Sequence, residues 1–393
     1  MSLLQFTDNP PLSLYVHLPW CVEKCPYCDF NSHGLKGRDL PEEKYVDALL
    51  RDLEPELPLI WGRPIETIFL GGGTPSLFSP EALDRLMSGL RALLDLRFTR
   101  EVTLEVNPGT DMASRLAEYR AIGFNRVSIG VQSFNDESLK RLGRIHDRRA
   151  AWRTIEAAHD AGLDSFNIDL MHGLPGQTED DGLVDIDTAI SLEPPHLSWY
   201  QLTIEPNTAF AFSPPALPPE ATLDRIGEAG AQRLLDAGYG HYEISAFAQP
   251  DHSCQHNLNY WQFGDYLGIG AGAHGKLTIP AENRIERRLR SPHPNQYLEL
   301  AGQPANIDAH DIKRQEIPFE FMLNALRLTK GFPVGLFQER TGMPIAMVSK
   351  TLRGLEEDGL IEWDIQTIRP TDRGLRFLND VLGRFLPDES PAG

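Results

Sequence analysis

The sequence predicts an α/β protein with an open, partial barrel of six βα units and a second, helical domain after it. Two observations point to this fold class. Short β-branched and apolar runs alternate with longer amphipathic patterns over the first 250 residues, as in repeated βα units around a parallel sheet. The pattern changes after Pro250, and the length of 393 residues suits two or three domains of roughly 100–200 residues.

The strands are short runs rich in Val, Ile, Leu and Phe. We predict them at Ser13–Leu18, Glu66–Gly71, Glu101–Asn107, Arg126–Gln132, Ser165–Met171 and His196–Thr203, with His241–Ala248 as a candidate seventh. Six βα units are fewer than the eight of a closed barrel. We therefore expect an open, TIM-like (β/α)6 barrel, with its site at the carboxyl ends of the strands, where the βα loops gather.

Amphipathic helices separate these strands, several of them beginning at Pro or Asp and ending at Gly. They are predicted at Glu42–Leu53, Pro80–Leu94, Asp111–Ile122, Arg148–Ala161, Asp180–Ser191 and Thr222–Ala237. Together with the strands they assign residues 1–249 to the barrel.

Residues 250–306 are expected to connect two domains, because a Gly- and aromatic-rich stretch is followed by a polar, Pro-containing one. Residues 307–387 form the predicted C-terminal domain, in which Phe332–Phe385 has a winged-helix-like order of helix, helix, two short strands and helix. Its second helix carries Lys350 and Arg353 but also three acidic residues, which argues against DNA binding. Residues 388–393 are expected to be a disordered tail.

Composition and charge narrow the function classes. With 41% hydrophobic and 24% charged residues, the chain is typical of a globular protein. The 37 basic and 56 acidic residues give a net charge of −19, which disfavours nucleic acid and anionic membrane surfaces as partners. No apolar run is long enough to span a membrane and no signal peptide is recognisable, so we expect a cytoplasmic protein.

Three of the four cysteines, Cys21, Cys25 and Cys28, form a CxxxCxxC motif just after the first strand, whereas Cys254 stands alone. In a reducing compartment such a cluster indicates metal or redox chemistry rather than a disulfide framework. A structural zinc site would need a fourth ligand, for which His17, His33 and Cys254 are candidates. Three thiolates suit a 4Fe-4S cluster better, because they leave one of its four irons open for another ligand.

Gly71-Gly-Gly-Thr-Pro75 follows the second predicted strand, where bare backbone can approach a ligand closely. Together with the cysteine motif, it makes the sequence resemble the radical S-adenosylmethionine (SAM) superfamily. More closely, the chain resembles the subfamily of oxygen-independent coproporphyrinogen III oxidase and the HemW heme chaperones over nearly its whole length. The matching motifs are Tyr15-Val-His-Leu-Pro, Leu104-Glu-Val-Asn-Pro108, Gly130-Val-Gln-Ser-Phe134, Leu142-Gly-Arg144 and Asn167-Ile-Asp-Leu-Met-His-Gly-Leu-Pro-Gly-Gln177.

The resemblance implies a radical SAM barrel that holds a 4Fe-4S cluster on Cys21, Cys25 and Cys28. In that superfamily the reduced cluster cleaves SAM to methionine and a 5′-deoxyadenosyl radical. The SAM contacts implied for this chain are Tyr15, Tyr27, Gly72, Gly73, Thr74, Glu105, Gln132, Arg144 and Asp169. The three acidic and amide residues Glu105, Gln132 and Asp169 end strands that face the barrel mouth, and Arg144 can pair with a carboxylate.

Within the subfamily, three features favour the heme-chaperone branch. Phe30 stands where the oxidase has a fourth cysteine, and the first strand begins too near the N-terminus for the oxidase's extension. The third feature is Cys254-Gln-His-Asn-Leu-Asn-Tyr-Trp261, which contains the HNxxYW motif of that branch. His256 or Cys254 could ligate heme iron, with Tyr260 and Trp261 against the porphyrin.

Several alternatives stay open at this stage. His256 could instead cap a turn while the two aromatic residues form interdomain core, and His17, His172 and His274 could be structural or face the porphyrin. The resemblance favours a heme chaperone that passes heme to acceptor hemoproteins, respiratory enzymes among them, with an electron donor for the cluster. The alternatives are a coproporphyrinogen III oxidase and a docking or transcriptional module. Whether the chain is an enzyme, cleaves SAM in its working cycle or forms a homodimer is left open.

Overall fold

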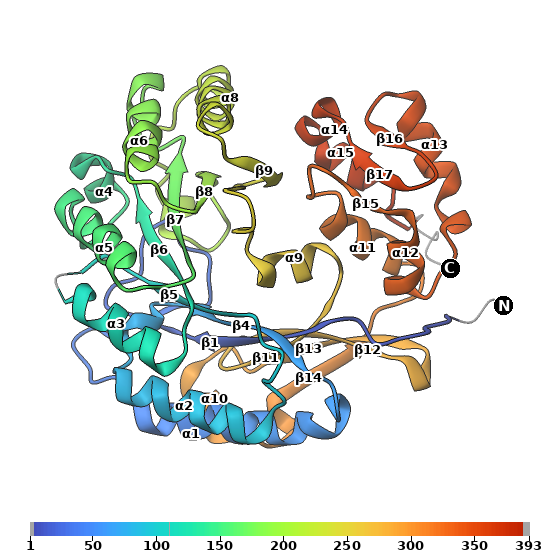
Figure 1. Ribbon diagram of the computed structural model, residues 1–393, viewed down its shortest axis with the longest axis horizontal. Helices are drawn as coiled ribbons and strands as arrows, with labels where there is room; N and C mark the ends of the chain where they lie inside the picture. Colours follow the sequence, from blue (N-terminus) through green and yellow to red (C-terminus); the bar gives the residue numbers. More distant parts are fainter. Residues whose placement is uncertain (1–3, 110, 388–393) are drawn as a thin grey trace.

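One twelve-stranded sheet organises the part of the chain that the computed structural model describes, residues 4–109 and 111–387. Its strand order is β14-β13-β12-β11-β1-β4-β5-β6-β7-β8-β10-β9, and the sheet is strongly curved (Figure 1). Its strands are β1 (Leu12–Leu18), β4 (Ile65–Gly72), β5 (Glu101–Val106), β6 (Arg126–Gln132), β7 (Ser165–His172), β8 (His196–Gln201), β9 (Gly240–Glu243), β10 (Ala246–Ala248), β11 (Asp265–Ile269), β12 (His274–Ile279), β13 (Arg284–Arg290) and β14 (Ile307–Asp311).

The six strands predicted from the sequence are β1 and β4 to β8, and they pair in parallel as expected. Their observed ends differ from the predicted ends by at most two residues. The fold-class prediction, an α/β partial barrel with a C-terminal domain, is therefore confirmed. The carboxyl ends of these strands meet at one edge of the sheet, which positions the site.

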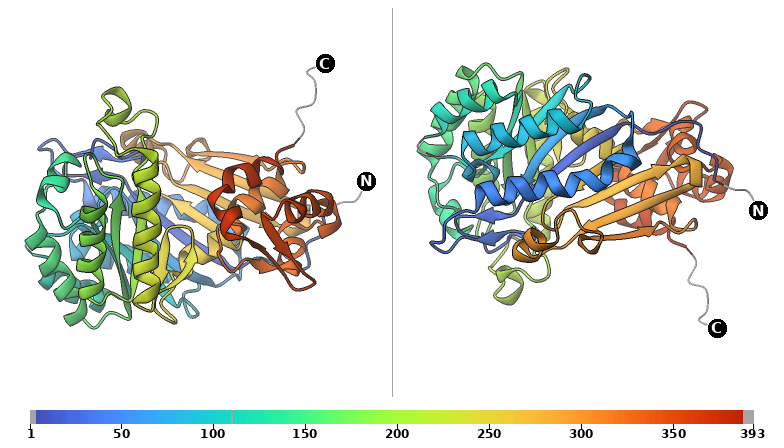
Figure 2. Two further views of the ribbon diagram at one scale, coloured as in Figure 1. Left: turned by 90° about the horizontal axis from the view of Figure 1, so that it is seen from above. Right: turned by 90° about the horizontal axis from the view of Figure 1, so that it is seen from below.

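The structure corrects three expectations about the sheet. The candidate seventh strand, His241–Ala248, is two short strands, β9 and β10, which run antiparallel at the edge beside β8. The segment expected to connect two domains contains β11, which pairs in parallel with β1, and then β12 and β13, which continue the sheet in antiparallel order (Figure 2). Ile307–Asp311, expected to be helical, is strand β14 of the same sheet.

Charged side chains interrupt the apolar pattern by which strands are predicted, most clearly in β13. Arg290 on β13 is buried and bonds through Nε to the Asp52 carboxylate, 2.8 Å from Oδ1, and through Nη2 to Glu56, 3.0 Å from Oε1. Asp52 lies in helix α1 (Glu42–Leu53), and Glu56 lies in the 3-10 helix that follows it, Glu54–Ile60. Because the charges neutralise one another inside the protein, a strand that reads as polar lies against the barrel core.

The predicted barrel helices are all present, with ends within two residues of expectation, and they lie on the outer side of the sheet (Figure 1). Local capping explains several ends: the Ser79 hydroxyl accepts a hydrogen bond from the Ala82 amide, and Thr178 and Asp181 form a capping box. The helices up to residue 300 are α1 (Glu42–Leu53), α2 (Pro80–Leu93), α3 (Met112–Ile122), α4 (Asp136–Arg141), α5 (Arg148–Asp160), α6 (Glu179–Ser191), α7 (Ala209–Phe212), α8 (Glu220–Asp236), α9 (Gln255–Trp261) and α10 (Pro294–Leu300).

The C-terminal domain has its own hydrophobic core, to which Phe263 and Ile285 of the preceding segment also contribute. Its small sheet has the order β15-β17-β16. The predicted winged-helix-like order of helix, helix, two strands and helix is present, but an unpredicted strand, β15, precedes it and the last helix is divided into α14 and α15. The elements are α11 (Ile317–Ala325), β15 (Phe332–Pro333), α12 (Val334–Thr341), α13 (Ser349–Glu357), β16 (Ile361–Trp363), β17 (Thr367–Pro370), α14 (Asp372–Arg376) and α15 (Leu378–Gly383). Residues 388–393, the predicted tail, lie outside the described residues.

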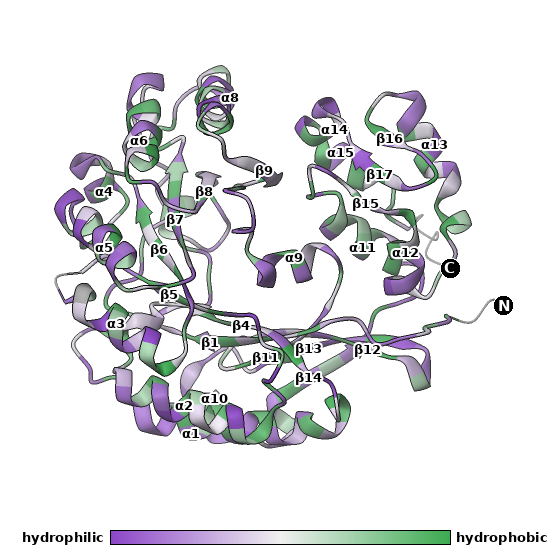
Figure 3. Ribbon diagram, viewed as in Figure 1, coloured by the Kyte–Doolittle hydropathy of each residue, from purple (hydrophilic) through white to green (hydrophobic). Residues whose placement is uncertain are grey.

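Helix α9 lies on the inner side of the barrel sheet, between it and the C-terminal domain (Figure 1). The domain also touches the sheet edge, where the Thr329 hydroxyl donates to the His241 carbonyl at 2.6 Å and Arg327 pairs with Glu243 at 3.1 Å. Figure 3 shows polar residues on the outward sides of the barrel helices. Among the described residues, no helix has both the length and the apolar character needed to cross a bilayer.

Candidate functional site

A large cavity of about 1080 Å³ opens at the carboxyl ends of the parallel strands; we call it the barrel cavity. It lies where the barrel geometry predicts a site. Every cofactor-binding or metal-ligating residue predicted from the sequence lines it: Tyr15, Cys21, Cys25, Tyr27, Cys28, Gly72, Gly73, Thr74, Glu105, Gln132, Arg144, Asp169 and His256. The fold thus brings together residues that are up to 241 positions apart in the chain, from Tyr15 to His256.

The three cysteines lie on a loop closed by a short parallel pairing of β2 (Trp20–Cys21) with β3 (His33–Gly34). All three are partly exposed. The Ser32 hydroxyl lies 3.6 Å from the Cys28 sulfur, and burial raises the pKa of the Cys21 and Cys28 thiols. Within the described residues, no three His, Cys, Asp or Glu side chains are arranged to hold a single metal ion. Three thiols on one cavity fit a cubane cluster, in which each thiolate binds a different iron.

The glycines at the end of β4 are held by backbone hydrogen bonds to the start of the cysteine loop. The Gly73 amide donates to the Leu18 carbonyl at 2.8 Å, and the Thr74 amide donates to the Trp20 carbonyl at 2.7 Å. A Cβ on Gly73 would lie 2.5 Å from the Trp20 carbonyl oxygen, too close for any side chain. From the sequence we explained Gly73 by the close approach of a ligand to its backbone. The structure gives a second reason, because the cysteine loop already leaves no room for a side chain at this position.

Arg144 is fixed by three polar contacts at the cavity wall. Its Nη2 donates to Asn107 Oδ1 and to the Gly130 carbonyl, both at 2.7 Å, and its Nη1 lies 3.7 Å from the Cys25 sulfur. Asn107 also donates to the Thr74 hydroxyl at 3.0 Å, so it joins two of the predicted SAM contacts. The Arg144 Nε is buried and has no hydrogen-bond partner among the described residues.

Two buried acidic residues, Glu105 and Asp169, lie in the wall of the cavity. Burial and the Asp169 carboxylate together raise the pKa of Glu105 to about 8, while its Oε2 accepts a hydrogen bond from the Gly72 amide at 3.1 Å. Burial also raises the pKa of Asp169, which accepts hydrogen bonds from Ser128 at 2.9 Å and Asn167 at 2.8 Å. Buried carboxylates without an ion-pair partner suit a cationic ligand such as a sulfonium or an ammonium group.

The remaining predicted contacts line the cavity from other directions. The Tyr15 hydroxyl lies 2.9 Å from His17 Nδ1, and His17 Nε2 lies 2.9 Å from the Asn31 carbonyl. Both ring nitrogens of His17 are therefore engaged in hydrogen bonds within the protein. Tyr27 packs against Phe210. Gln132 ends β6 with a φ of 70°, which turns its side chain at the strand end.

Helix α9 carries the HNxxYW motif, and its histidine is bonded on both sides. His256 Nδ1 lies 2.8 Å from the Thr67 hydroxyl, and His256 Nε2 lies 2.8 Å from the Tyr260 hydroxyl. Burial and the Arg126 guanidinium lower the pKa of His256 to about 3. Neither ring nitrogen is free to bind iron in this arrangement. Cys254 is likewise buried, with its sulfur 3.4 Å from Glu101 and its pKa raised to about 12 by burial.

Sequence reasoning missed two residues that build the site. Asn107 belongs to a quoted motif and lies two positions after Glu105, so the alternation of the strand was a signal for it. Glu101, at the start of β5, accepts hydrogen bonds from the backbone amides of Gln255 at 2.9 Å and His256 at 3.0 Å. It therefore anchors the N-terminus of α9 across 154 and 155 positions, a link that has no local sequence signal.

Comparisons with known proteins agree with this geometry. The family described as "Radical SAM superfamily" matches residues 15–189, and the "HemN C-terminal domain" matches residues 312–377. The chain is 49% identical over 382 residues to "Heme chaperone HemW" of Escherichia coli (strain K12), covering 96% of this chain and 99% of that protein. It is 33% identical to the protein of the same name from Bacillus subtilis (strain 168), covering 95% and 99%.

Among solved structures, one reported as "Coproporphyrinogen III oxidase (HemN) from Escherichia coli is a Radical SAM enzyme" matches with a TM-score of 0.80 and 25% identity. The match covers 96% of this chain and 90% of that one. The resemblance inferred from the motifs is thereby confirmed. This chain belongs to the radical SAM superfamily and, within it, to the family of the heme chaperone HemW.

Proposed function

We propose that this protein is a heme chaperone that binds a 4Fe-4S cluster, SAM and heme and passes heme to acceptor hemoproteins. The observation that carries the proposal is the 49% identity to a protein named a heme chaperone along almost the full length of both chains. The acceptors in this proposal include respiratory enzymes, and an electron donor serves the cluster. The work is done in the cytoplasm.

In this proposal Cys21, Cys25 and Cys28 hold the cluster, which supplies an open iron and an electron to SAM. The positive sulfonium and ammonium groups of SAM are attracted to Glu105 and Asp169, two buried acidic residues of the barrel cavity, and favour their charged forms. Arg144, with its unpartnered Nε, takes the SAM carboxylate. The remaining contacts are Tyr15, Tyr27, Gly72, Gly73, Thr74 and Gln132.

A second candidate function is coproporphyrinogen III oxidation, because the TM-score of 0.80 to the oxidase extends over nearly the whole chain. The position after the cysteine motif argues against it. Phe30, which stands in place of the oxidase's fourth cysteine, lines the barrel cavity with 60% of its surface exposed. A thiol at this wall of the cavity is thus replaced by an apolar ring.

One experiment separates the two functions. The full chain is reconstituted anaerobically with iron and sulfide, then assayed in parallel for heme binding and transfer to an apo-hemoprotein, and for coproporphyrinogen turnover with SAM and reductant. We expect heme transfer without decarboxylation. Decarboxylated product from the wild-type chain would overturn the chaperone proposal, as would a failure to bind heme.

A further inference from the structure

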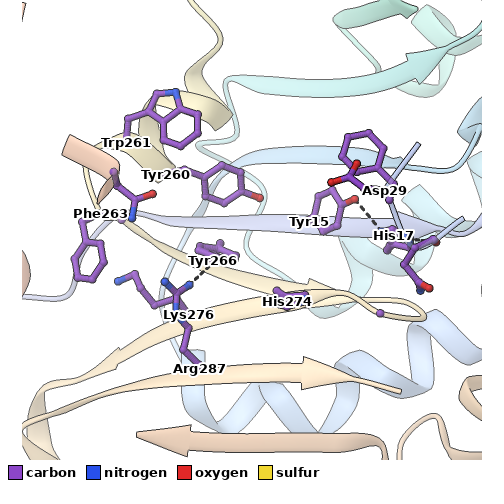
Figure 4. A pocket seen from close by; sticks show the side chains of 15 residues that line it. Tyr15, His17, Asp29, Tyr260, Trp261, Phe263, Tyr266, His274, Lys276 and Arg287 are labelled. Carbon is purple, nitrogen blue, oxygen red and sulfur yellow. Dashed lines mark hydrogen bonds between the residues drawn. The ribbon is translucent and has the colours of Figure 1, made fainter. Parts of the chain in front are cut away.

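A second cavity, of about 540 Å³, lies beside the barrel cavity, between α9, the cysteine loop and strands β11 to β13 (Figure 4). We call it the aromatic cavity, after the rings of Tyr15, Tyr260, Trp261, Phe263 and Tyr266 that line it. Its volume lies in the range of small-molecule and cofactor sites. Tyr260, Trp261 and His274, which the sequence offered as possible porphyrin contacts, line this cavity, and of the predicted SAM contacts only Tyr15 reaches it.

The two cavities share a wall. Tyr15, Asp29, Phe30, Tyr260 and Trp261 line both of them. A ligand in the aromatic cavity would therefore lie next to the barrel cavity, on the side where the cysteine loop passes. Because the shared side chains are mostly aromatic rings, this wall suits a flat apolar ligand.

His274 offers the aromatic cavity an unused imidazole. It is exposed at the start of β12, and its ring forms no hydrogen bond with any described residue. Partial burial and the neighbouring Arg287 lower its pKa, which favours the neutral ring that binds metals. Figure 4 shows it between Tyr266 and His17 on the floor of the cavity.

The other histidines that line the two cavities are engaged. His17 contacts Tyr15 and the Asn31 carbonyl, and His256 contacts Thr67 and Tyr260, in each case through both nitrogens. His196 likewise lies 2.6 Å from Asn167 Oδ1 and 2.8 Å from the Tyr242 hydroxyl. Among the histidines that line the two cavities, only His274 could bind a metal ion without first losing a hydrogen bond to another described residue.

Besides its histidines, the charged or titratable side chains that line the aromatic cavity include two cations, Lys276 and Arg287, and one carboxylate, Asp29. Both cations already have partners: Lys276 pairs with Asp265 at 2.9 Å, and Arg287 bonds to Glu320 and to the Tyr266 hydroxyl. Of the five guanidinium N–H donors of Arg287, these two bonds leave others for a carboxylate.

Trp261 adds an unused donor at the shared wall. Its indole Nε1 is buried and has no hydrogen-bond partner among the described residues, while its ring stacks against the Arg327 guanidinium at 4.3 Å. Buried donors without partners are uncommon in folded proteins, and this one is left unsatisfied at the wall that the two cavities share.

We propose that the aromatic cavity is the heme site of this protein, with His274 as an axial ligand to the iron, the macrocycle against Tyr260 and Tyr266, and a propionate at Arg287. This inference rests on the proposed heme-binding function. It gives the HNxxYW motif a supporting role: His256 is a positioning residue that holds the Tyr260 hydroxyl and thereby one wall of the cavity.

The test is heme titration of the full, cluster-loaded chain, followed by difference absorption spectra. His274→Ala should weaken heme binding by about tenfold or more and remove the imidazole-ligated Soret band. His274→Gly should regain that band when free imidazole is added. His310→Ala is the matched control, because His310 is also exposed and without a ring hydrogen bond, but lies on β14 outside the cavity. It should bind heme as the wild type does.

The possible results distinguish an error in the proposed heme site from an error in the proposed heme-chaperone function. If the wild type binds heme and His274→Ala keeps both its spectrum and its affinity, the site is wrong and the heme-chaperone function stands. The site is also wrong if His256→Ala loses the imidazole spectrum while His274→Ala retains it. If the wild type does not bind heme at all, the proposed function itself fails. Circular dichroism of each variant shows whether a loss of binding comes from unfolding.

Discussion

Glu101 should be the residue on which the position of helix α9 depends. Its Oε2 accepts a hydrogen bond from the Gln255 amide at 2.9 Å, and its Oε1 accepts one from the His256 amide at 3.0 Å. These are the first two amides of α9, which have no acceptor within the helix. Their acceptor is a carboxylate from a distant strand, and negative charge is favourable at a helix N-terminus.

The Glu101→Gln substitution keeps the shape of the side chain but leaves one oxygen in place of two. An amide NH₂ group then faces a backbone N–H, so at least one charge-assisted hydrogen bond is lost. Such a bond contributes about 1.5–3 kcal/mol. The buried Arg126 guanidinium also loses a nearby negative charge, which adds to the cost.

Hydrogen exchange measures this locally. If α9 opens more easily by about 1.5–3 kcal/mol, exchange of its amides should accelerate by about tenfold to 150-fold. Peptides from the outer barrel helices should keep their rates. Glu299→Gln is the control, because Glu299 is exposed on α10 and its carboxylate forms no hydrogen bond with a described residue. Unchanged exchange of α9 in Glu101→Gln would refute the anchoring role.

Three further predictions follow from the site and the core. Replacing any cysteine of the CxxxCxxC motif by alanine should abolish the binding of about four irons per chain in anaerobic reconstitution, whereas Cys254→Ala should not; a single zinc without labile sulfide in the wild type would contradict this. Gly73→Ala should destabilise the chain to urea by about 1–3 kcal/mol, because its Cβ would collide with the Trp20 carbonyl, while Gly109→Ala, with nothing within 4 Å, should be tolerated; equal midpoints would argue against the collision. Burial lowers the pKa of His172 to about 4, so the folded chain keeps this ring neutral, whereas the unfolded chain protonates it below about pH 6.5 and stability is lost as the pH falls. His172→Phe should remove up to about 1.4 kcal/mol of that loss per pH unit. Urea titrations of both proteins at pH 7 and pH 5 measure it, and the same loss of stability in the variant as in the wild type would refute the prediction.

Much of the barrel could be predicted from the sequence because the signals that specify it are local. The apolar runs of β1 and β4 to β8 and the capping residues of the helices lie within the segments they define, and the predicted ends differ from the observed ends by at most two residues. The cysteine motif is also local, since three thiols within eight residues come together on one loop whatever the rest of the chain does. The family resemblance then extended the site to residues on five further strand ends and loops.

Tertiary structure decided what depends on distant partners. Strands β11 to β14 were not predicted. Strand β13 is rich in arginine, and its Arg290 is buried in ion pairs with Asp52 and Glu56, which are more than 230 positions away in the chain. The role of His256 was open in the sequence, and contacts with Thr67, 189 positions away, and with Tyr260 occupy both of its ring nitrogens. The sequence shows which side chains are present, but hydrogen bonds between residues so far apart form only when the sheet brings them together. Those hydrogen bonds determine which imidazole has no partner in the protein and can bind a ligand.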